Sequence, residues 1–450
     1  MSALGLRWHA RSRRAGARRG AVLRPALGAA GVATVAVAGV ELAVHSAARA
    51  SSSAPITQRG FGFPAWMAGP LHHVMRTQLT SRAYGLLVLA MCAGYVVAVV
   101  NHRALPAGPV LAAVAVLHLA FMVAPPLGLT DMTNYVGYAR LGELHQLSPY
   151  VHTPAAAAAD PSFPWTTWRH YRSPYGPLFT LLTYALAPLG IVWTFWGLKA
   201  IVALAAGGCL ALVWRCARLL GRPPLGAVVL VGLNPAWLVW AVGGGHNDTL
   251  MELLVLAALA LALASRPALA GGAAVAAAAV KVPALLVLPF LALARGSSRR
   301  QLLAGAVAAA VLVGLTTLIA FGSLAPLTAF DRQASFVSQR SAIGQLVSAF
   351  GGSALSPAVR DVAAVALVGV VGGSLAWAWR TGRWLDGYAW AATGMVAVLL
   401  WVFPWYVVWL LPAAALARRP AVRVAAVALT LVLLWAYTPH ATLLAWLGLG

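Results

Sequence analysis

The chain has 450 residues, of which 61% are hydrophobic and only 9% are charged. This composition excludes an ordinary soluble protein and indicates an all-α polytopic membrane protein. Thirty arginines and two lysines against nine acids give a formal charge of +23, which makes nucleic acid a partner class to consider. The arginines lie mostly in short runs between apolar segments, as positive-inside signals do. Their expected partners are therefore membrane lipids and not nucleic acid.

The first expected element is a basic cytoplasmic arm, residues 1–24, which carries seven arginines and no acid. The apolar run 25–44 is nearly long enough to span a bilayer, and residues 48–51 (Ala-Arg-Ala-Ser) resemble a signal-peptidase site. A permanent anchor and a cleaved signal peptide both fit. We favour the anchor because a cleavable apolar region usually has about 7 to 15 residues. Either interpretation places residues 51–82 outside.

Residues 25–450 are expected to form a single transmembrane domain of about 10–13 helices. Spans are expected at 84–100, 110–127, 192–214, 225–242, 247–264, 302–321, 358–379, 387–403 and 404–417. With these spans the arginine runs near 215–222, 266, 295–300, 380–383 and 418–423 all lie in the cytoplasm. The segments 178–188 and those on either side of Lys281 are too short to span, so we expect short re-entrant or interfacial helices there. The cysteines lie in apolar segments at no metal-binding spacing, and no metal site is expected.

The longest polar segment, residues 128–177, is predicted to be an outer loop carrying short interfacial helices, and loops of this length are more often functional than idle. Asp131 opens it directly after a membrane exit. A partly desolvated carboxylate there is expected to have a raised pKa, in the range useful to a general base. An N-cap on a helix over 132–144 is an equally open alternative.

The other acids divide by position along the chain. Asp248 also stands at an outer membrane exit, and Glu41, Asp361 and Asp386 lie near segment ends, where we expect structural roles. The acids that remain as candidates are Glu143, Asp160, Glu252 and Asp331.

The segment Gly243–Asp248 joins two expected spans. Its three glycines allow a sharp turn or a close approach to a ligand, and they leave His246 and Asn247 at a helix N-terminus that favours anions. A donor phosphate could bind there. A tight hairpin capped by Asn247 or Asp248 is the structural alternative, and it is compatible with phosphate binding.

Three further groups could serve a membrane enzyme. Lys281 interrupts an apolar region, so a lipid phosphate or an Asp is its expected partner, with snorkelling to an interface as the alternative. Arg172, with Arg169 and His170, could bind phosphate or simply face solvent. Residues 403–409 (Phe-Pro-Trp-Tyr followed by Trp409) could form a sugar platform, but an outer aromatic belt is the commoner use.

Taken in order, these motifs resemble one family of enzymes. They are Asp131 to Arg140, Ser148 to Tyr150, Ser173 to Pro177, Asn234-Pro235 with Gly243 to Asp248, Lys281 to Pro283, and Trp405 to Pro412. The ordered set is similar to the GT-C class of polyprenyl-phosphate-sugar glycosyltransferases. Within that class it is similar to the actinobacterial polyprenol-phosphate-mannose-dependent α-1,6-mannosyltransferases.

The resemblance implies a GT-C-like bundle in the plasma membrane with its active site facing outside. Asp131 would be the general base that activates an acceptor hydroxyl, which attacks the anomeric carbon of the donor with inversion. The donor would be a polyprenyl-phosphate-mannose and the acceptor a cell-envelope mannan or glycolipid, with no cofactor. Within this scheme we expect donor phosphate or substrate to contact Lys281, His246, Asn247, Asp248, Arg172, Tyr175, Tyr150 and Tyr135.

Other functions fit parts of the pattern. An arabinose or other polyprenyl-linked sugar transferase would use the same scaffold. A transporter or flippase would also have many helices and a lysine near mid-membrane, but it predicts inverted repeats and ionisable pairs deep in the spans, and the sequence shows neither. A non-catalytic scaffold leaves the Pro/Tyr loop unexplained.

Overall fold

The computed structural model describes residues 3–47, 65–74, 79–128, 130–294, 296, 298–327, 336–338, 340–351 and 356–438. In this part of the chain, helices and loops account for the whole structure and there is no strand. The predicted all-α, polytopic class is thereby confirmed. The proposed signal-peptidase site at 48–51 and Asp331 lie outside the described residues.

Six helices are long and apolar enough to cross a membrane. Their apolar stretches are Leu23–Ser46, Ser81–Ala104, Ile191–Leu219, Arg299–Phe321, Pro357–Thr381 and Pro420–Tyr437. Five shorter apolar helices accompany them, at Ala107–Val123, Pro177–Leu189, Pro267–Ala278, Val282–Leu291 and Pro404–Leu416. The short segments expected at 178–188 and around Lys281 are among these five, so their predicted shortness is confirmed.

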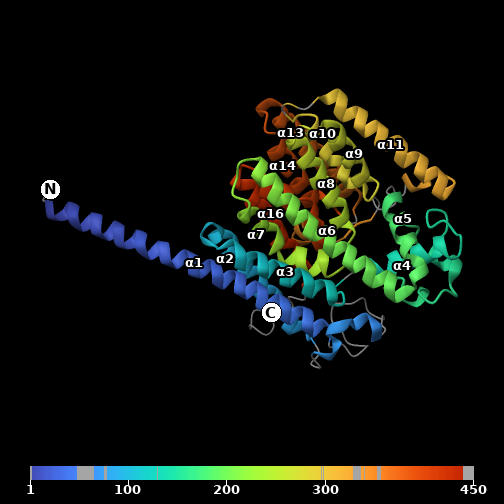
Figure 1. Cartoon of the computed structure of the whole chain (residues 1–450), viewed down its shortest axis with the longest axis horizontal. Coiled ribbons are helices and arrows are strands. Elements are labelled where there is room, and N and C mark those ends of the chain that lie inside the picture. The colour runs from blue at the N-terminus through green and yellow to red at the C-terminus, as the bar shows by residue number, and fades with distance from the viewer. Residues whose placement is uncertain are drawn as a thin grey trace.

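The first helix, α1 (Ala3–Ala47), runs without interruption through the basic arm and the first apolar run. Its C-terminal half packs along α2 (Ser81–Asn101), while its N-terminal half projects away from the bundle (Figure 1). The helices that follow along the bundle are α3 (Ala107–Val123), α6 (Ile191–Leu219), α11 (Arg299–Phe321), α13 (Pro357–Thr381), α14 (Trp384–Val398) and α16 (Pro420–Tyr437).

The span predicted over 225–242 is not one helix. It divides into α7 (Leu225–Gly232) and a π-helical turn over Trp237–Val242, separated by Asn234 and Pro235. Pro235 has no N–H to continue the helical ladder, and the Asn234 side chain accepts hydrogen bonds from the N–H groups of Ala236 and Trp237 at 3.0 and 3.1 Å. A π-helical turn is rare and is found mostly at functional sites.

Two other predicted spans also differ from the structure. The span predicted over 387–403 is α14, which ends earlier, at Val398. The span predicted over 404–417 divides into two short pieces, a 3-10 turn at Pro404–Trp409 and α15 (Leu411–Leu416). Between the π-helical turn and the Lys281 segment lie α8 (Asp248–Leu263) and α9 (Pro267–Ala278), and after it lie a 3-10 turn (Val282–Leu286) and α10 (Val287–Leu291).

The predicted outer loop folds as a small unit at one side of the bundle (Figure 1). It contains α4 (Met132–Glu143) and two 3-10 turns, Pro154–Ala157 and Phe163–Trp165, before α5 (Pro177–Leu186) begins. Asn134 on α4 holds the returning segment of the loop, because its Oδ1 accepts from Thr167 N, Thr167 Oγ1 and Trp168 N at 2.9 to 3.0 Å. The loop is therefore fixed by its own hydrogen bonds and not only by the membrane.

Candidate active site

Asp131 stands at the first position before α4, where the open alternative was a helix cap. Its side chain makes no capping hydrogen bond. Thr130 serves there instead, since its Oγ1 accepts from Met132 N at 3.1 Å and donates to Gly244 O at 2.7 Å. The N-cap interpretation of Asp131 is therefore wrong, and the 19%-exposed carboxylate remains open to a substrate.

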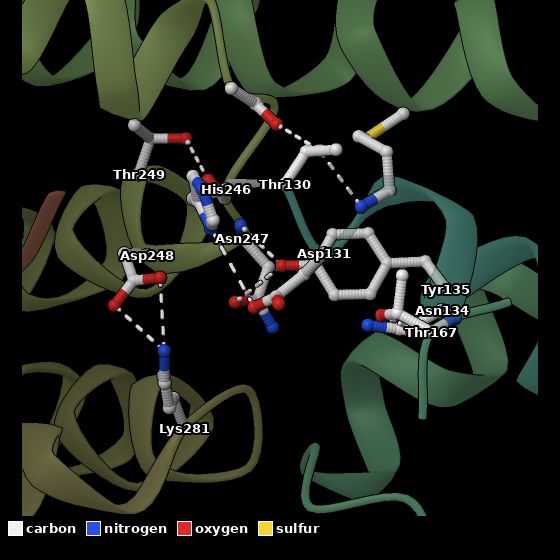
Figure 2. Close-up of polar contacts among 12 residues, drawn as sticks. Thr130, Asp131, Asn134, Tyr135, Thr167, His246, Asn247, Asp248, Thr249 and Lys281 are labelled. Atoms are coloured by element: carbon white, nitrogen blue, oxygen red, sulfur yellow. Dashed lines mark hydrogen bonds and ion pairs between the residues drawn. The ribbon is translucent and has the colours of Figure 1, made fainter. Parts of the chain in front are cut away.

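The Gly-rich turn brings His246 against this carboxylate. His246 is fully buried, and its Nδ1 lies 3.6 Å from Asp131 Oδ2 (Figure 2). Gly245 has a φ of +73°, and a Cβ on it would lie 2.6 Å from the Met132 side chain. Only glycine therefore allows the turn to approach the start of α4 this closely.

The ring of His246 is held from its other side by an aromatic residue. Trp405 stacks on it with 3.6 Å between ring centroids and 12° between planes. Trp405 and Trp409 are only 3% and 5% exposed, so they lie in the protein interior beside the site. The prediction that this tail motif forms an aromatic belt at the outer interface is therefore wrong.

Asn247 is tied to the first turn of α4. Tyr135 Oη donates to Asn247 Oδ1 and accepts from Asn247 N, both at 3.2 Å (Figure 2). The side-chain amide nitrogen of Asn247 is buried and has no hydrogen-bond partner among the described residues. A buried amide donor without a partner costs free energy, so an anionic or hydroxyl-bearing ligand would relieve that cost.

Lys281 forms a buried ion pair with Asp248. Its Nζ lies 2.9 and 3.0 Å from the two carboxylate oxygens, and the side chains are 6% and 0% exposed. Trp409 Nε1 donates to the same carboxylate at 2.6 Å, and the rings of Tyr406 and Trp409 lie 5.2 and 5.5 Å from Nζ. The expected Asp partner of Lys281 is thus found, and the snorkelling alternative is not.

The pKa of Asp131 is shifted in the direction opposite to the sequence-based prediction. Burial alone raises it, but the neighbouring His246, the Lys281 ammonium and the Tyr175 hydroxyl favour the carboxylate and bring the pKa below its ordinary value. The sequence places Asp131 at a membrane exit, which predicts desolvation. It does not reveal that three cationic or donor groups from distant segments act on the same carboxylate.

The tyrosines expected at the site lie in its wall. Tyr175 packs edge-on against Tyr135, with 4.8 Å between ring centroids. Tyr150 joins the two Ser-Pro-Tyr tripeptides, since its hydroxyl donates to Tyr175 O at 2.9 Å while Ser173 N donates to Pro149 O at 2.8 Å. These hydrogen bonds join the two tripeptides and thereby close the loop. Tyr150 supports the site by holding Tyr175 in place.

Arg172 is exposed on the loop, and the structure gives it no hydrogen bond or ion pair with the described residues of the site. The end of the loop instead docks beside Lys281. Gly176 N donates to Val280 O at 3.1 Å, and a Cβ on Gly176 would lie 2.2 Å from Ala279 O. The loop thus positions Lys281 through its neighbouring backbone.

One positioning group was missed by sequence reasoning. Lys199 on α6 is fully buried, and its Nζ donates to the carbonyls of Phe121, Ala124 and Gly243 at 2.6 to 2.8 Å. A lysine inside a predicted span was the available signal, because such a charge marks a functional position by default.

Asp160, a candidate from the sequence, lies in the loop. Asp160 accepts from Arg140 at 2.9 to 3.2 Å, and His145 Nε2 lies 2.7 Å from it. Burial raises the pKa of Asp160, but Arg140, Ser162 and His145 lower it far below its ordinary value. Asp160 was a candidate for chemistry, and its full set of donors indicates a structural ion pair.

Among the described residues, no three His, Cys, Asp or Glu side chains gather as metal ligands would.

Comparison with known proteins supports the family resemblance. Residues 25–297 match a sequence profile described as the N-terminal domain of alpha-(1->6)-mannopyranosyltransferases. A probable alpha-(1->6)-mannopyranosyltransferase of Mycolicibacterium smegmatis is 28% identical over 370 residues, which cover 69% of this chain and 66% of the relative. An alpha-(1->6)-mannopyranosyltransferase of Mycobacterium tuberculosis is 30% identical over 32% of this chain and 26% of its own length.

A third relative, alpha-(1->6)-mannopyranosyltransferase A of Corynebacterium glutamicum, is 34% identical over 28% of this chain and 26% of its own length. The chain thus spans just under two thirds of the first relative and about a quarter of the other two. No solved structure matches it. Because the profile covers more than half of the sequence, the chain belongs to the alpha-(1->6)-mannopyranosyltransferase family.

Proposed function

We propose that this protein transfers mannose from a polyprenyl-phosphate-mannose donor to a cell-envelope glycan or glycolipid on the outer face of the plasma membrane. The observation that carries the proposal is the state of Asp131. Its carboxylate is partly exposed, performs no capping role and is held ionised beside Lys281 and His246. An accessible, ionised carboxylate can accept the proton of a hydroxyl, although its lowered pKa makes it a weaker base than one whose pKa lies near the working pH.

The reaction requires one proton transfer and one substitution. Asp131 takes the proton of the acceptor hydroxyl as that oxygen attacks the anomeric carbon. The bond from that carbon to the phosphate oxygen breaks, and the lipid phosphate leaves with the electron pair. Attack from the face opposite the phosphate inverts the anomeric carbon.

The departing phosphate gains negative charge and needs donors that are already oriented. The Asn247 amide nitrogen is a buried donor without a partner among the described residues, which suits this role. Lys281 shares its charge with Asp248, so it supplies a field at the site while the ion pair keeps its position fixed. Asp248 is thereby a positioning residue in this proposal.

The outward orientation follows from the arginine runs. Asp131 lies eight residues beyond the C-terminal end of α3, whereas Arg103 lies four residues before the N-terminal end of the same helix. Under the positive-inside rule the Arg103 end is cytoplasmic, and the Asp131 end is therefore outside.

The test is mannose transfer from synthetic mannosyl-phosphoryl-polyprenol to a short α-1,6-mannoside by the purified protein in nanodiscs. Asp131→Asn should lower the rate by about 10² to 10⁴, the usual contribution of a general base. Asp361→Asn is the matched control, since Asp361 is an exposed acid near the start of α13, and it should transfer normally.

Two outcomes would contradict the proposal. Transfer that survives in Asp131→Asn would exclude this residue as the base and direct attention to Asp248. Absence of mannose transfer by the unmodified protein, with a verified donor, would exclude mannose as the sugar. Other polyprenyl-linked sugars, arabinose first, and then lipid transport would be assayed next.

A further inference from the structure

A cavity separate from the Asp131 site lies far from it, between α1, α2, α7 and α16. It is a groove of roughly 770 Å³, a size within the range of about 300 to 1,000 Å³ that small-molecule sites have. Arg103, which lines the groove, lies just before the N-terminal end of α3, whereas Asp131 follows the C-terminal end of that helix. The 17 residues of α3 separate the two by about 25 Å, at about 1.5 Å per residue. In Figure 1, α7 and α4 lie on opposite sides of the bundle.

The groove has a basic rim. Arg24, Arg103 and Arg423 line it, and each stands at an end of an apolar span: the start of Leu23–Ser46, the end of Ser81–Ala104 and the first turn of α16. In the described part of the chain none of the three forms an ion pair with a carboxylate. These three positive charges therefore surround an opening without a protein counter-charge.

The surroundings of the rim are basic as well. Burial, and then the positive charges of Arg418 and Arg423, lower the pKa of the neighbouring Arg222, with only Asp386 acting in the opposite direction. The Asp386 carboxylate is itself occupied by the backbone N–H groups of Arg418 and Arg419, at 2.6 and 3.1 Å. An anion entering the groove would thus meet excess positive charge.

The walls of the groove, in contrast, are apolar. Val100 and Val424 line it and are 72% and 67% exposed. Val427, Ala428 and Leu431 continue the lining along α16, and Leu431 lies eight residues beyond Arg423, or about 12 Å along the helix. A ligand that fits must therefore be anionic at one end and apolar for at least that length.

We propose that this groove binds an anionic glycerophospholipid of the inner leaflet, with the phosphate at the arginine rim and an acyl chain along α2 and α16. Basic pockets between transmembrane helices on the cytoplasmic side bind anionic lipid headgroups in this way. The site does not depend on the transfer reaction, because it shares no residue with the Asp131 site.

The test is native mass spectrometry of the purified, delipidated protein titrated with phosphatidylglycerol, and with phosphatidylcholine of the same acyl chains. The unmodified protein should bind one phosphatidylglycerol in clear preference to phosphatidylcholine. In Arg103→Gln/Arg423→Gln, phosphatidylglycerol should bind roughly 30-fold more weakly, the effect of removing two arginine contacts at an anionic lipid surface. Phosphatidylcholine binding should not change.

Two matched variants make the assignment specific. Arg380→Gln/Arg383→Gln removes two exposed arginines near the end of α13 that do not line the groove, and it should bind like the unmodified protein. Ala428→Trp fills the groove while retaining every charge, and it should lose the bound lipid. Equal losses in both double-arginine variants would reduce the effect to general surface charge and overturn the proposal.

Other occupants would give different results. If phosphatidylcholine binds as tightly as phosphatidylglycerol, the rim does not select an anion. If inorganic phosphate at equal concentration displaces the lipid, the rim is a soluble-anion site. If the delipidated protein is a dimer that Ala428→Trp converts to a monomer, the groove is an interface between copies. Each of these results would overturn the lipid proposal.

Discussion

The buried ion pair between Lys281 and Asp248 gives the most informative perturbation of the site. The charges are about 3 Å apart and the side chains are 6% and 0% exposed. At an effective dielectric of about 20 their attraction is roughly 5 kcal/mol, which the cost of removing both charges from water largely offsets. The net contribution of the pair is therefore small, but removal of one partner leaves an uncompensated buried charge.

We predict that Lys281→Met and Asp248→Asn each destabilise the protein by about 3 to 5 kcal/mol, while the double variant recovers most of that loss. Asn at position 248 keeps an oxygen that can accept from Trp409 Nε1, so the double variant retains this hydrogen bond. Since unfolding entropy scales with chain length, 1 kcal/mol corresponds to about 1 °C in a chain of this size. The single variants should therefore melt about 3 to 5 °C lower.

The assay combines thermal unfolding in one detergent with mannose transfer by the same preparations. Stability should return in the double variant while transfer stays low, because the ammonium that faces Asp131 is absent. Double and single variants that melt alike would refute the coupling of the pair. Full transfer by the stable double variant would refute the electrostatic role of Lys281.

Three other predictions test the surroundings of the site. Trp405→Leu removes the ring stacked on His246 and should lower transfer about 10-fold at unchanged folding, in line with a stacking contribution of about 0.5 to 1.5 kcal/mol, whereas Trp405→Phe should retain most activity. Lys199→Met leaves three buried carbonyls without their donor, Gly243 among them, and should lower both the melting temperature and transfer; an unchanged melting temperature would contradict it. Because the folded-state pKa of Asp160 is lowered, its stabilisation should be fully present above its unfolded pKa of about 4 and decline as the pH falls further. Asp160→Asn should flatten this dependence, and an identical acid limb in both proteins would exclude the effect.

Much of the fold follows from local properties of the sequence. Hydropathy over about 20 residues marks the long spans, and it also marks the segments around Lys281 as too short to cross. The long polar loop and its first carboxylate are equally local features. The lone lysine in an apolar segment requires a partner wherever the chain folds, and Asp was one of the two partners expected.

The sequence misplaced features that depend on packing between distant segments. The tail motif 403–409 has the composition of an interfacial belt, yet Trp405 stacks on a histidine 159 positions earlier in the chain. Hydropathy does not distinguish an aromatic residue that faces lipid from one that faces the protein core, since both environments are apolar. Only the arrangement of the helices decided between them.

The sequence by itself determined that this protein is a helical membrane protein with Asp131 at a loop entrance, because spans and exits are set by the hydrophobicity of contiguous residues. The tertiary structure alone decided the pKa direction of that carboxylate and showed that its side chain does not cap α4. Thr130 Oγ1 accepts the capping hydrogen bond from Met132 N and donates to Gly244 O, 114 residues away, while His246 and Lys281 arrive from two other segments. The charge state of a group depends on everything within a few ångströms in space, and neighbours in space are here not neighbours in the chain.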